Sequence, residues 1–453
     1  MLTKMKTTLS FYLFIISFCF IFAACEPSKP PRNVILITID TLRPDHLSCY
    51  GYNRITSPSI DRIASEGVRY DNVFCQLTST TPSHCSILTG LSPATHGVLA
   101  NWEPLPPEFN TLAEILKGTG FRTGAVVSNW SLKKERGLDQ GFDFYDDFLP
   151  EQELNRPLFF KKDPEDTTKS ALEWLDKNKE KPFFLFINYM DPHGPYTPPP
   201  PYNNAFAVSR TSATEVLPFS EKNDAPHAIP AYQRLGEATN PAYYVSQYDG
   251  EIQYTDYWLG KLIEKIKDWG LLDTTLIIVT SDHGESLGEH DYYFMHSNLT
   301  YKEQASVPLI IRFPPLFRAG KVVHTRIEGM DLMPTILQVC GISYKGKVEG
   351  QSFLRVEKEK NSNPVTVLSE SARMISVYKE PWELVILEKN PIELYNLTLD
   401  PLEKRNVLET SDPETQQSLF SIAAKYFNQP RSNKKSNIKE EDKETLRSLG
   451  YIN

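Results

Sequence analysis

NVILITID, at residues 33–40, is the stretch that decides the fold, because an apolar run without polar alternation leads directly into Asp40. Such a run is typical of a strand buried on both faces, as in a parallel sheet covered by helices. We expect four further strands of the same kind, at residues 124–127 (GAVV), 183–189 (FFLFINY), 275–281 (TLIIVTS) and 307–313 (VPLIIRF).

Helical patterns lie between the expected strands, at residues 58–66, 83–89, 112–117, 167–179 and 245–269. Strands that alternate with helices are typical of α/β folds. The alternation therefore predicts a mostly parallel sheet with helices on both faces.

The first residues have the pattern of an export signal. Lys4 and Lys6 precede an apolar run from Leu9 to Ala24, and polar, Pro-rich sequence follows Cys25. FAAC at 22–25 is similar to a bacterial lipoprotein cleavage site, in which Cys25 would carry lipid and attach the protein to a membrane. We expect an exported protein of the periplasm or cell envelope, with a cleaved signal peptide or an uncleaved anchor as the alternatives.

The C-terminal part of the chain has a different pattern. A charged linker at 357–363 leads to short alternating runs at 365–371, 375–378, 382–387 and 393–397, and then to a helical pattern at 416–427. These runs predict a smaller antiparallel α+β subdomain. The expected organisation is an export signal at 1–25, a catalytic domain at 26–356, and a C-terminal subdomain and tail at 357–453.

Composition excludes some classes of function. The 453 residues are 40% apolar and 23% charged, which is ordinary for a folded globular protein. The net charge of -9 is spread without a block of one sign, so we expect no nucleic-acid partner. The four cysteines outside the export segment form no C-x-x-C pair, which disfavours a thiolate zinc site and leaves disulfides open.

Acids and histidines follow three of the expected strands, at Asp40, at Asp191 with His193, and at Asp282 with His283. Ligands in open α/β sheets collect at the carboxyl ends of strands. One aspartate there is weak evidence, because turns and helix caps also use aspartate. Together, carboxylates and a neutral imidazole are suitable ligands for a divalent cation such as zinc, manganese, magnesium or calcium.

A hydroxyl-rich turn, STTPSH at 79–84, stands immediately before the helical pattern at 83–89. A helix amino end and a nearby cation both favour an alkoxide over an alcohol, and both attract an anionic sulfuryl or phosphoryl group. An ordinary Thr cap is the alternative interpretation of Thr80.

Longer motifs resemble sulfatases of the alkaline-phosphatase superfamily, in order and rough spacing from Asn33 to Gly450. They are ILITIDTLRPDHLSCYGY, TTPSHCSILTG, YMDPHGPY, YDGEIQYTD, TSDHGESLGEH, VPLIIR, MDLMPTIL and ELYNLTLDP. The resemblance implies a doubly wound fold, metal ligands at Asp40, Asp282 and His283, and a nucleophile at Thr80 that also contacts the metal.

The nucleophile motif departs from the pattern that the resemblance implies. Sulfatases proper carry C-x-P-S-R or S-x-P-S-R, whose first residue becomes formylglycine, whereas residues 80–84 read TTPSH. Thr80 then stands at the modified position and His84 at the arginine position, and we expect both to be catalytic residues. A Thr nucleophile suits phosphorus better than sulfur, since water can clear a phosphoryl intermediate.

Two further histidines, His193 and His296, are candidates for protonating the leaving group or for holding a second metal. One metal site is expected, and a second is left open. A surface loop position is the alternative interpretation of His296, and a cap of the Pro-rich turn is the alternative for Asp191.

These observations leave three hypotheses for function. The first is a metal-dependent hydrolase of phosphate or sulfate esters on small molecules, glycans or lipid headgroups, with Thr80 favouring phosphomonoesters or phosphodiesters. The second is a phosphoethanolamine- or phosphoglycerol-type transferase of the cell envelope. The third is an inactive homologue that only binds its ligand.

Overall fold

Strand β1 (Asn33–Ile39) lies within an eight-stranded sheet, and all of its residues are buried. The computed structural model describes residues 29–222, 226–354 and 364–427. In it, β1 pairs in parallel with β8 (Phe183–Tyr189) on one side and β9 (Thr275–Thr280) on the other. The expected strands at 33–39 and 183–189 are confirmed to the residue.

The sheet is mostly parallel, as expected, with one reversed strand near its edge. The strand order is β13 (Lys321–Val323), β2 (Val68–Tyr70), β12 (Leu309–Arg312), β9, β1, β8, β4 (Arg122–Val126) and β5 (Phe144–Asp146). Strand β12 runs antiparallel to both of its neighbours, which its apolar sequence did not indicate. The short strands β2, β5 and β13 were not expected, because they have too few apolar residues to form a distinct run.

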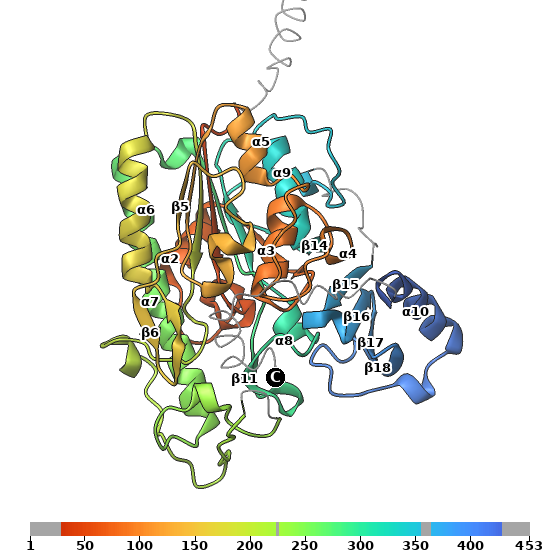
Figure 1. Ribbon diagram of the computed structural model, residues 1–453. Coiled ribbons are helices and arrows are strands. Elements are labelled where there is room, and N and C mark those ends of the chain that lie inside the picture. Colours follow the sequence, from red (N-terminus) through yellow and green to blue (C-terminus); the bar gives the residue numbers. More distant parts are fainter. Residues whose placement is uncertain (1–28, 223–225, 355–363, 428–453) are drawn as a thin grey trace, which may run out of the picture. The chain divides into compact units, whose positions relative to one another are not determined.

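Helices cover both faces of the sheet (Figure 1). One face carries α2 (Pro58–Glu66), α6 (Pro164–Asn178) and α7 (Pro241–Asp268), and the other carries α3 (Thr80–Thr89), α5 (Leu112–Gly118) and α9 (Leu332–Val339). Strand β1 serves both layers, because Val34 and Leu36 join the core under α3 while Ile35 and Ile37 join the core under α7. This two-sided burial explains the absence of polar alternation in β1.

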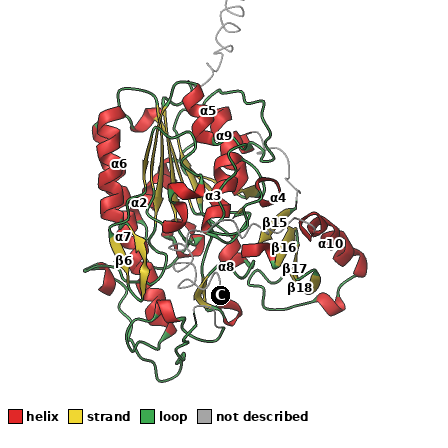
Figure 2. Ribbon diagram, viewed as in Figure 1, coloured by secondary structure: helices red, strands yellow, loops and turns green. Residues whose placement is uncertain are grey.

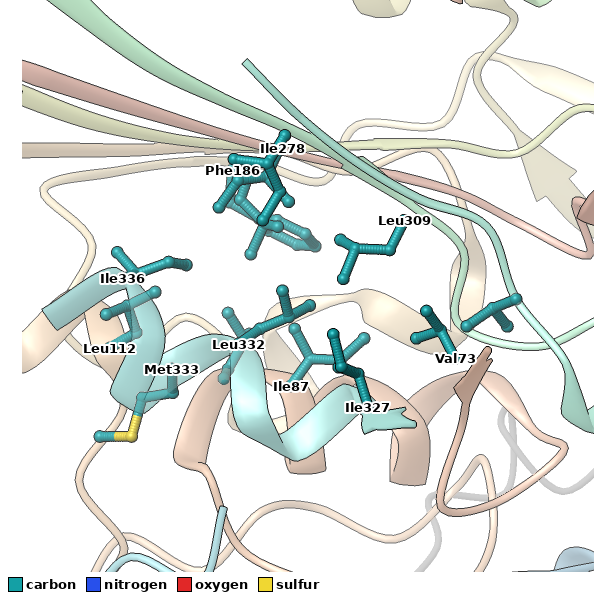
Figure 3. Close-up of a cluster of buried hydrophobic side chains, with 14 of the residues drawn as sticks. Val73, Ile87, Leu112, Phe186, Ile278, Leu309, Ile327, Leu332, Met333 and Ile336 are labelled. Atoms are coloured by element: carbon teal, nitrogen blue, oxygen red, sulfur yellow. The ribbon is translucent and has the colours of Figure 1, made fainter. Parts of the chain in front are cut away.

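The core on the α3 side holds α3 against the sheet. Figure 3 shows Ile87 of α3 and Leu332 of α9 below Phe186, Ile278 and Leu309 of the sheet. The short pieces α4 (Pro93–His96), α8 (Lys302–Ala305), β3 (Val73–Phe74) with β14 (Ile327–Glu328), β10 (Ser286–Leu287) with β11 (Tyr293–Met295), and β6 (Glu151–Glu153) with β7 (Arg156–Lys161) connect the main elements.

A separate antiparallel sheet follows, as the alternating runs predicted (Figure 2). Its order is β15 (Val365–Leu368), β16 (Met374–Lys379), β17 (Trp382–Leu387) and β18 (Asn390–Asn396), and α10 (Pro413–Phe427) packs on it. Its core also contains Leu77 and Leu99 from the first part of the chain. By their contacts, the described residues from Pro31 onward belong to one compact unit.

Several expectations concern residues outside the described ranges. The export signal at 1–25 and Cys25 lie there, and so does the boundary expected at 356/357. Within the described ranges, no helix is both long enough and apolar enough to cross a membrane.

A substitution in β1 tests the packing of the sheet. Leu36 is fully buried, so Leu36→Ala should lower the free energy of unfolding by about 2–5 kcal/mol through lost burial and a cavity. Leu399, 83% exposed, is the matched control, and Leu399→Ala should stay within about 0.5 kcal/mol. Equal effects of the two substitutions in urea denaturation would contradict this account of the core.

Candidate metal and nucleophile site

Two neighbouring strands deliver the acidic side chains of the site. Asp40 directly follows β1, and Asp282 with His283 follows β9 after one intervening serine, Ser281. Because β1 and β9 are parallel and adjacent, their carboxyl ends lie together at one edge of the sheet. His283 Nε2 is 3.8 Å from Asp40 Oδ1 and 3.5 Å from Asp282 Oδ2.

The two carboxylates fit a cation because each keeps one buried oxygen without a hydrogen-bond partner. These atoms are Asp40 Oδ1 and Asp282 Oδ2, and both residues are fully buried. Asp40, Asp282 and His283 offer ligand atoms within 4.8 Å of one another. Burial, followed by the negative charge of Asp282, raises the pKa of Asp40 well above its usual value. A bound divalent cation would remove this penalty, since it pairs with both charges.

His283 is oriented as a metal-binding histidine would be. Its Nδ1–H donates to the Gly284 carbonyl at 2.9 Å, which leaves the lone pair of Nε2 directed at the two carboxylates. Burial lowers the pKa of His283 to about 4, so the ring is neutral. Gly284 is required next to it, because a Cβ there would lie 2.1 Å from the Glu303 carbonyl oxygen.

Thr80 is the first residue of α3, and Ser79 precedes it as the N-cap. The sequence predicted a helix from residue 83, but the structure starts it three residues earlier. Pro82 is compatible with this start, since the first turn of a helix needs no N–H from it. Thr80 Oγ1 lies 3.5 Å from His283 Nε2, and Thr80 is 1% exposed. The structure thus brings Thr80 together with the three expected metal ligands.

His84 lies one turn further along α3, with both ring nitrogens engaged. Nδ1–H donates to the Thr80 carbonyl at 2.8 Å, and the Thr38 hydroxyl lies 2.9 Å from Nε2. Burial lowers the pKa of His84, so the neutral ring accepts the Thr38 proton at Nε2. These contacts tie the nucleophile helix to β1. They hold the His84 ring against the backbone of Thr80. The expected catalytic role of His84 stays a prediction.

His193 and His296 are near the site and in contact with each other, with ring centroids 4.9 Å apart. The ring of His296 also lies 4.5 Å from that of His283. His193 donates its Nδ1–H to the Gly194 carbonyl at 2.7 Å, and burial holds the pKa of His193 well below its usual value. Its Nε2 is therefore a free acceptor. Asp191, two residues before His193, forms an ion pair through Oδ1 with Lys161 Nζ at 2.6 Å.

Sequence reasoning missed three polar residues that line or support this site. Asn129 follows β4 and donates from Nδ2 to Asp40 Oδ2 at 2.5 Å, which turns the other oxygen toward Asp282 and His283. Glu285 accepts from His296 Nδ1 at 3.2 Å. The buried Thr41 hydroxyl has no hydrogen-bond partner, and its backbone has a φ of +57°. A left-handed β-branched residue next to Asp40 is strained, which is common at functional sites.

A second group, His290 with Glu303 and Glu403, has metal-like spacing. Burial opposes protonation of His290, but the hydrogen bond and charge of Glu303 raise its pKa to about 9. Its Nδ1–H donates to Glu303 Oε1 at 3.1 Å and its Nε2–H to the Glu403 carbonyl at 3.2 Å. With both ring nitrogens engaged in this way, His290 forms an ion pair with Glu303. Among the described residues, these two groups alone have such spacing.

Comparison with known proteins identifies the family. The model of the family described as Sulfatase matches residues 32–342. The chain belongs to the sulfatase family. A second model, described as N-sulphoglucosamine sulphohydrolase, C-terminal, matches residues 288–425 of this sulfatase-family chain. The chain is therefore an ester hydrolase of the alkaline-phosphatase superfamily, as the motifs implied.

Individual relatives of this sulfatase-family chain agree. An arylsulfatase of Clostridium perfringens is 24% identical over 382 residues, covering 73% of this chain and 79% of that protein. The iduronate 2-sulfatase of Homo sapiens is 27% identical over 404 residues, covering 71% of each protein.

Solved structures confirm the fold of this sulfatase-family chain. BT4656 in complex with its substrate D-glucosamine-2-N,6-O-disulfate has a TM-score of 0.73 at 22% identity, covering 89% of this chain and 100% of that one. The phosphonate monoester hydrolase of Agrobacterium radiobacter has a TM-score of 0.69 at 20% identity, covering 88% and 95%. The doubly wound sheet and the antiparallel C-terminal sheet are common features of this fold.

Metal binding by the sulfatase-family site can be measured without a substrate. Protein stripped by a chelator should gain about 2.7 kcal/mol of unfolding free energy when free Mn²⁺ reaches about 100 times its Kd. Asp282→Asn should lose most of this gain, because it removes a buried anionic ligand. Glu403→Gln, in the second group, should keep the gain, and the comparison within each variant cancels its own change in baseline stability. A gain that depends on Glu403 and not on Asp282 would refute the assignment.

Proposed function

We propose that the protein is a metal-dependent hydrolase in which Thr80 attacks phosphomonoesters or phosphodiesters. The observation that supports this best is the position of Thr80 Oγ1, 3.5 Å from His283 Nε2 at the start of α3. Asp40, Asp282 and His283 would hold the divalent cation, which would supply positive charge for the nucleophile oxygen and for the substrate oxygens. Its identity, among zinc, manganese, magnesium and calcium, is left to experiment.

Thr80 favours phosphorus over sulfur because of how the intermediate must break down. A formylglycine hydrate has a second hydroxyl, so it can release sulfate by collapsing to the aldehyde. Threonine has one hydroxyl, and its sulfate ester would have to be cleaved by water at sulfur. A phosphorylated threonine is cleared by in-line attack of water at phosphorus. The fold does not restrict the chain to sulfate esters, since one protein with this fold is named a phosphonate monoester hydrolase.

The reaction proceeds in two displacements at phosphorus. Thr80 Oγ loses its proton and forms a bond to phosphorus, while the bond to the leaving alcohol oxygen breaks and that oxygen takes up a proton. Water then attacks phosphorus, the bond to Thr80 Oγ breaks, and Thr80 regains its proton. The helix amino end at Thr80 stabilises the negative charge that develops on the oxygens.

His193 and His296 are the groups placed to move the proton of the leaving alcohol. Neutral His193 keeps a free Nε2, and His296 is oriented by Glu285 through Nδ1. A cleft of about 680 Å³ is lined in part by Asp191 and Pro195, which flank His193 in the sequence, and by Tyr254.

Substitution of Thr80 tests the nucleophile. Thr80→Ala should lower kcat for aryl phosphodiesters and phosphomonoesters by at least about 1,000-fold, because the covalent step is lost. Thr80→Ser keeps a hydroxyl and should retain measurable turnover. After an acid quench, mass spectrometry of the wild type should show a phosphoryl adduct on the peptide that contains Thr80.

The control lies at the other end of the same helix. Thr89 Oγ1 donates to the Cys85 carbonyl, so Thr89→Ala changes α3 without touching the nucleophile and should leave kcat within about threefold. Turnover of Thr80→Ala at the wild-type rate would rule out this mechanism. Turnover of aryl sulfates in preference to both phosphorus esters would move the substrate class to sulfate. Transfer of the phosphoryl group to an added alcohol without release to water would favour the transferase.

We also propose export and lipidation at Cys25, on the sequence alone. Residues 1–25 lie outside the described ranges. Export and lipidation place the enzyme in the periplasm or cell envelope. Labelling of expressed protein with a palmitate analogue should mark the wild type and not Cys25→Ala.

A further inference from the structure

The strand that starts the C-terminal sheet runs beside the segment that leads into the nucleophile. The backbone N–H of Thr78 donates to the Leu368 carbonyl at 3.0 Å, and the N–H of Leu368 donates to the Gln76 carbonyl at 3.0 Å. Leu77 and Leu368 form a parallel bridge. The C-terminal sheet is therefore joined by main-chain hydrogen bonds to the residues just before Thr80.

Glu370, two residues after β15, continues this contact with its side chain. Its Oε1 accepts the backbone N–H of Asn101 at 2.9 Å and lies 3.4 Å from the hydroxyl of Ser79. Asn101 in turn accepts the backbone N–H of Thr81 on its Oδ1 at 2.8 Å. Thr80 thus stands between Ser79, which Glu370 contacts, and Thr81, which Asn101 holds.

The main chain of Glu370 also reaches the histidine side of the site. Its N–H donates to the Ser297 carbonyl at 2.7 Å, and Ser297 directly follows His296. Glu370 is therefore joined both to the start of α3 and to the loop that carries His296. No metal ligand of the site contacts Glu370 in these bonds.

We propose that Glu370 is a positioning residue of the hydrolase, which fixes Thr80 Oγ and the His296 loop relative to each other. The proposal rests on the function proposed above for Thr80. It makes the C-terminal sheet part of the active site, although the metal ligands and the nucleophile come from the large sheet and its helices. A displacement of about 1 Å at the nucleophile is enough to lower a rate by about 100-fold.

The key variants are Glu370→Ala and Glu370→Gln. Glu370→Ala removes the acceptor for Asn101 and should lower kcat by about 100-fold with KM within about threefold, because substrate binding groups stay in place. Burial raises the pKa of Glu370 to about 7, and Oε1 accepts hydrogen bonds in either protonation state. The amide oxygen of Glu370→Gln can replace it, so this variant should recover kcat to within about fivefold of the wild type.

The matched control is another glutamate of the same sheet. Glu388 is exposed and pairs with Arg373 at 3.0 Å, so Glu388→Ala should leave kcat, KM and Mn²⁺ affinity at wild-type values. Glu370→Ala should also keep wild-type Mn²⁺ affinity, since Asp40, Asp282 and His283 are untouched. If Glu370→Ala does not fold, Asn101→Ala must show the same loss of kcat at unchanged Mn²⁺ affinity.

Hydrogen exchange gives a readout that needs no turnover. In Glu370→Ala, amides of residues 76–84 and 296–300 should exchange at least about tenfold faster than in the wild type, while Glu388→Ala leaves them unchanged. Unchanged exchange together with wild-type kcat overturns the proposal, and so does a Glu370→Gln variant as slow as Glu370→Ala. If wild-type protein hydrolyses no ester, the function proposed for Thr80 fails, and the exchange rates still decide the role of Glu370.

Discussion

The structure of the site depends on two buried carboxylates, Asp40 and Asp282, that are held side by side. Each has one oxygen that meets no hydrogen-bond donor, and burial penalises both charges. Such a pair is tolerated only where a cation or a proton compensates it. The parallel pairing of β1 with β9 brings the two residues together, and Asn129 sets the rotation of Asp40. Without this placement of Asp40 and Asp282, Thr80 and His283 would have no shared cation site beside them.

Much of this arrangement could be predicted from the sequence, because in a parallel sheet the position of a site residue follows from the strand directly before it. An apolar run predicts each buried strand, and the residue after the run must lie at the carboxyl edge of the sheet. Asp40, Asp282 and His283 were found by this reasoning. The nucleophile was harder, since a Thr before a helix is usually a cap. Thr80 was singled out by its place in the TTPSH turn and by the resemblance to sulfatases.

Other parts of the site could not be predicted because their contacts are not local. Asn129 is one of many asparagines after a strand, and only the fold shows that it meets Asp40. The sequence placed His84 at the arginine position of the motif and gave no sign of its contacts. Because the helix starts at Thr80, the ring of His84 points toward Thr38 of β1. The antiparallel direction of β12 could not be predicted either, because an apolar run does not show in which direction its strand runs.

The pairing of β15 with residues 76–78 has a consequence for the order of events during synthesis. Ser79 and Glu370 are separated by 291 positions in the chain, so the ribosome makes the nucleophile segment long before its neighbour. Contacts of such high sequence separation form late and slow the folding of a domain. The start of α3 can therefore reach its final geometry only after translation has passed the linker at 357–363. Shortened chains that end before this point would contain Asp40, Asp282, His283 and Thr80, and would still lack a finished site.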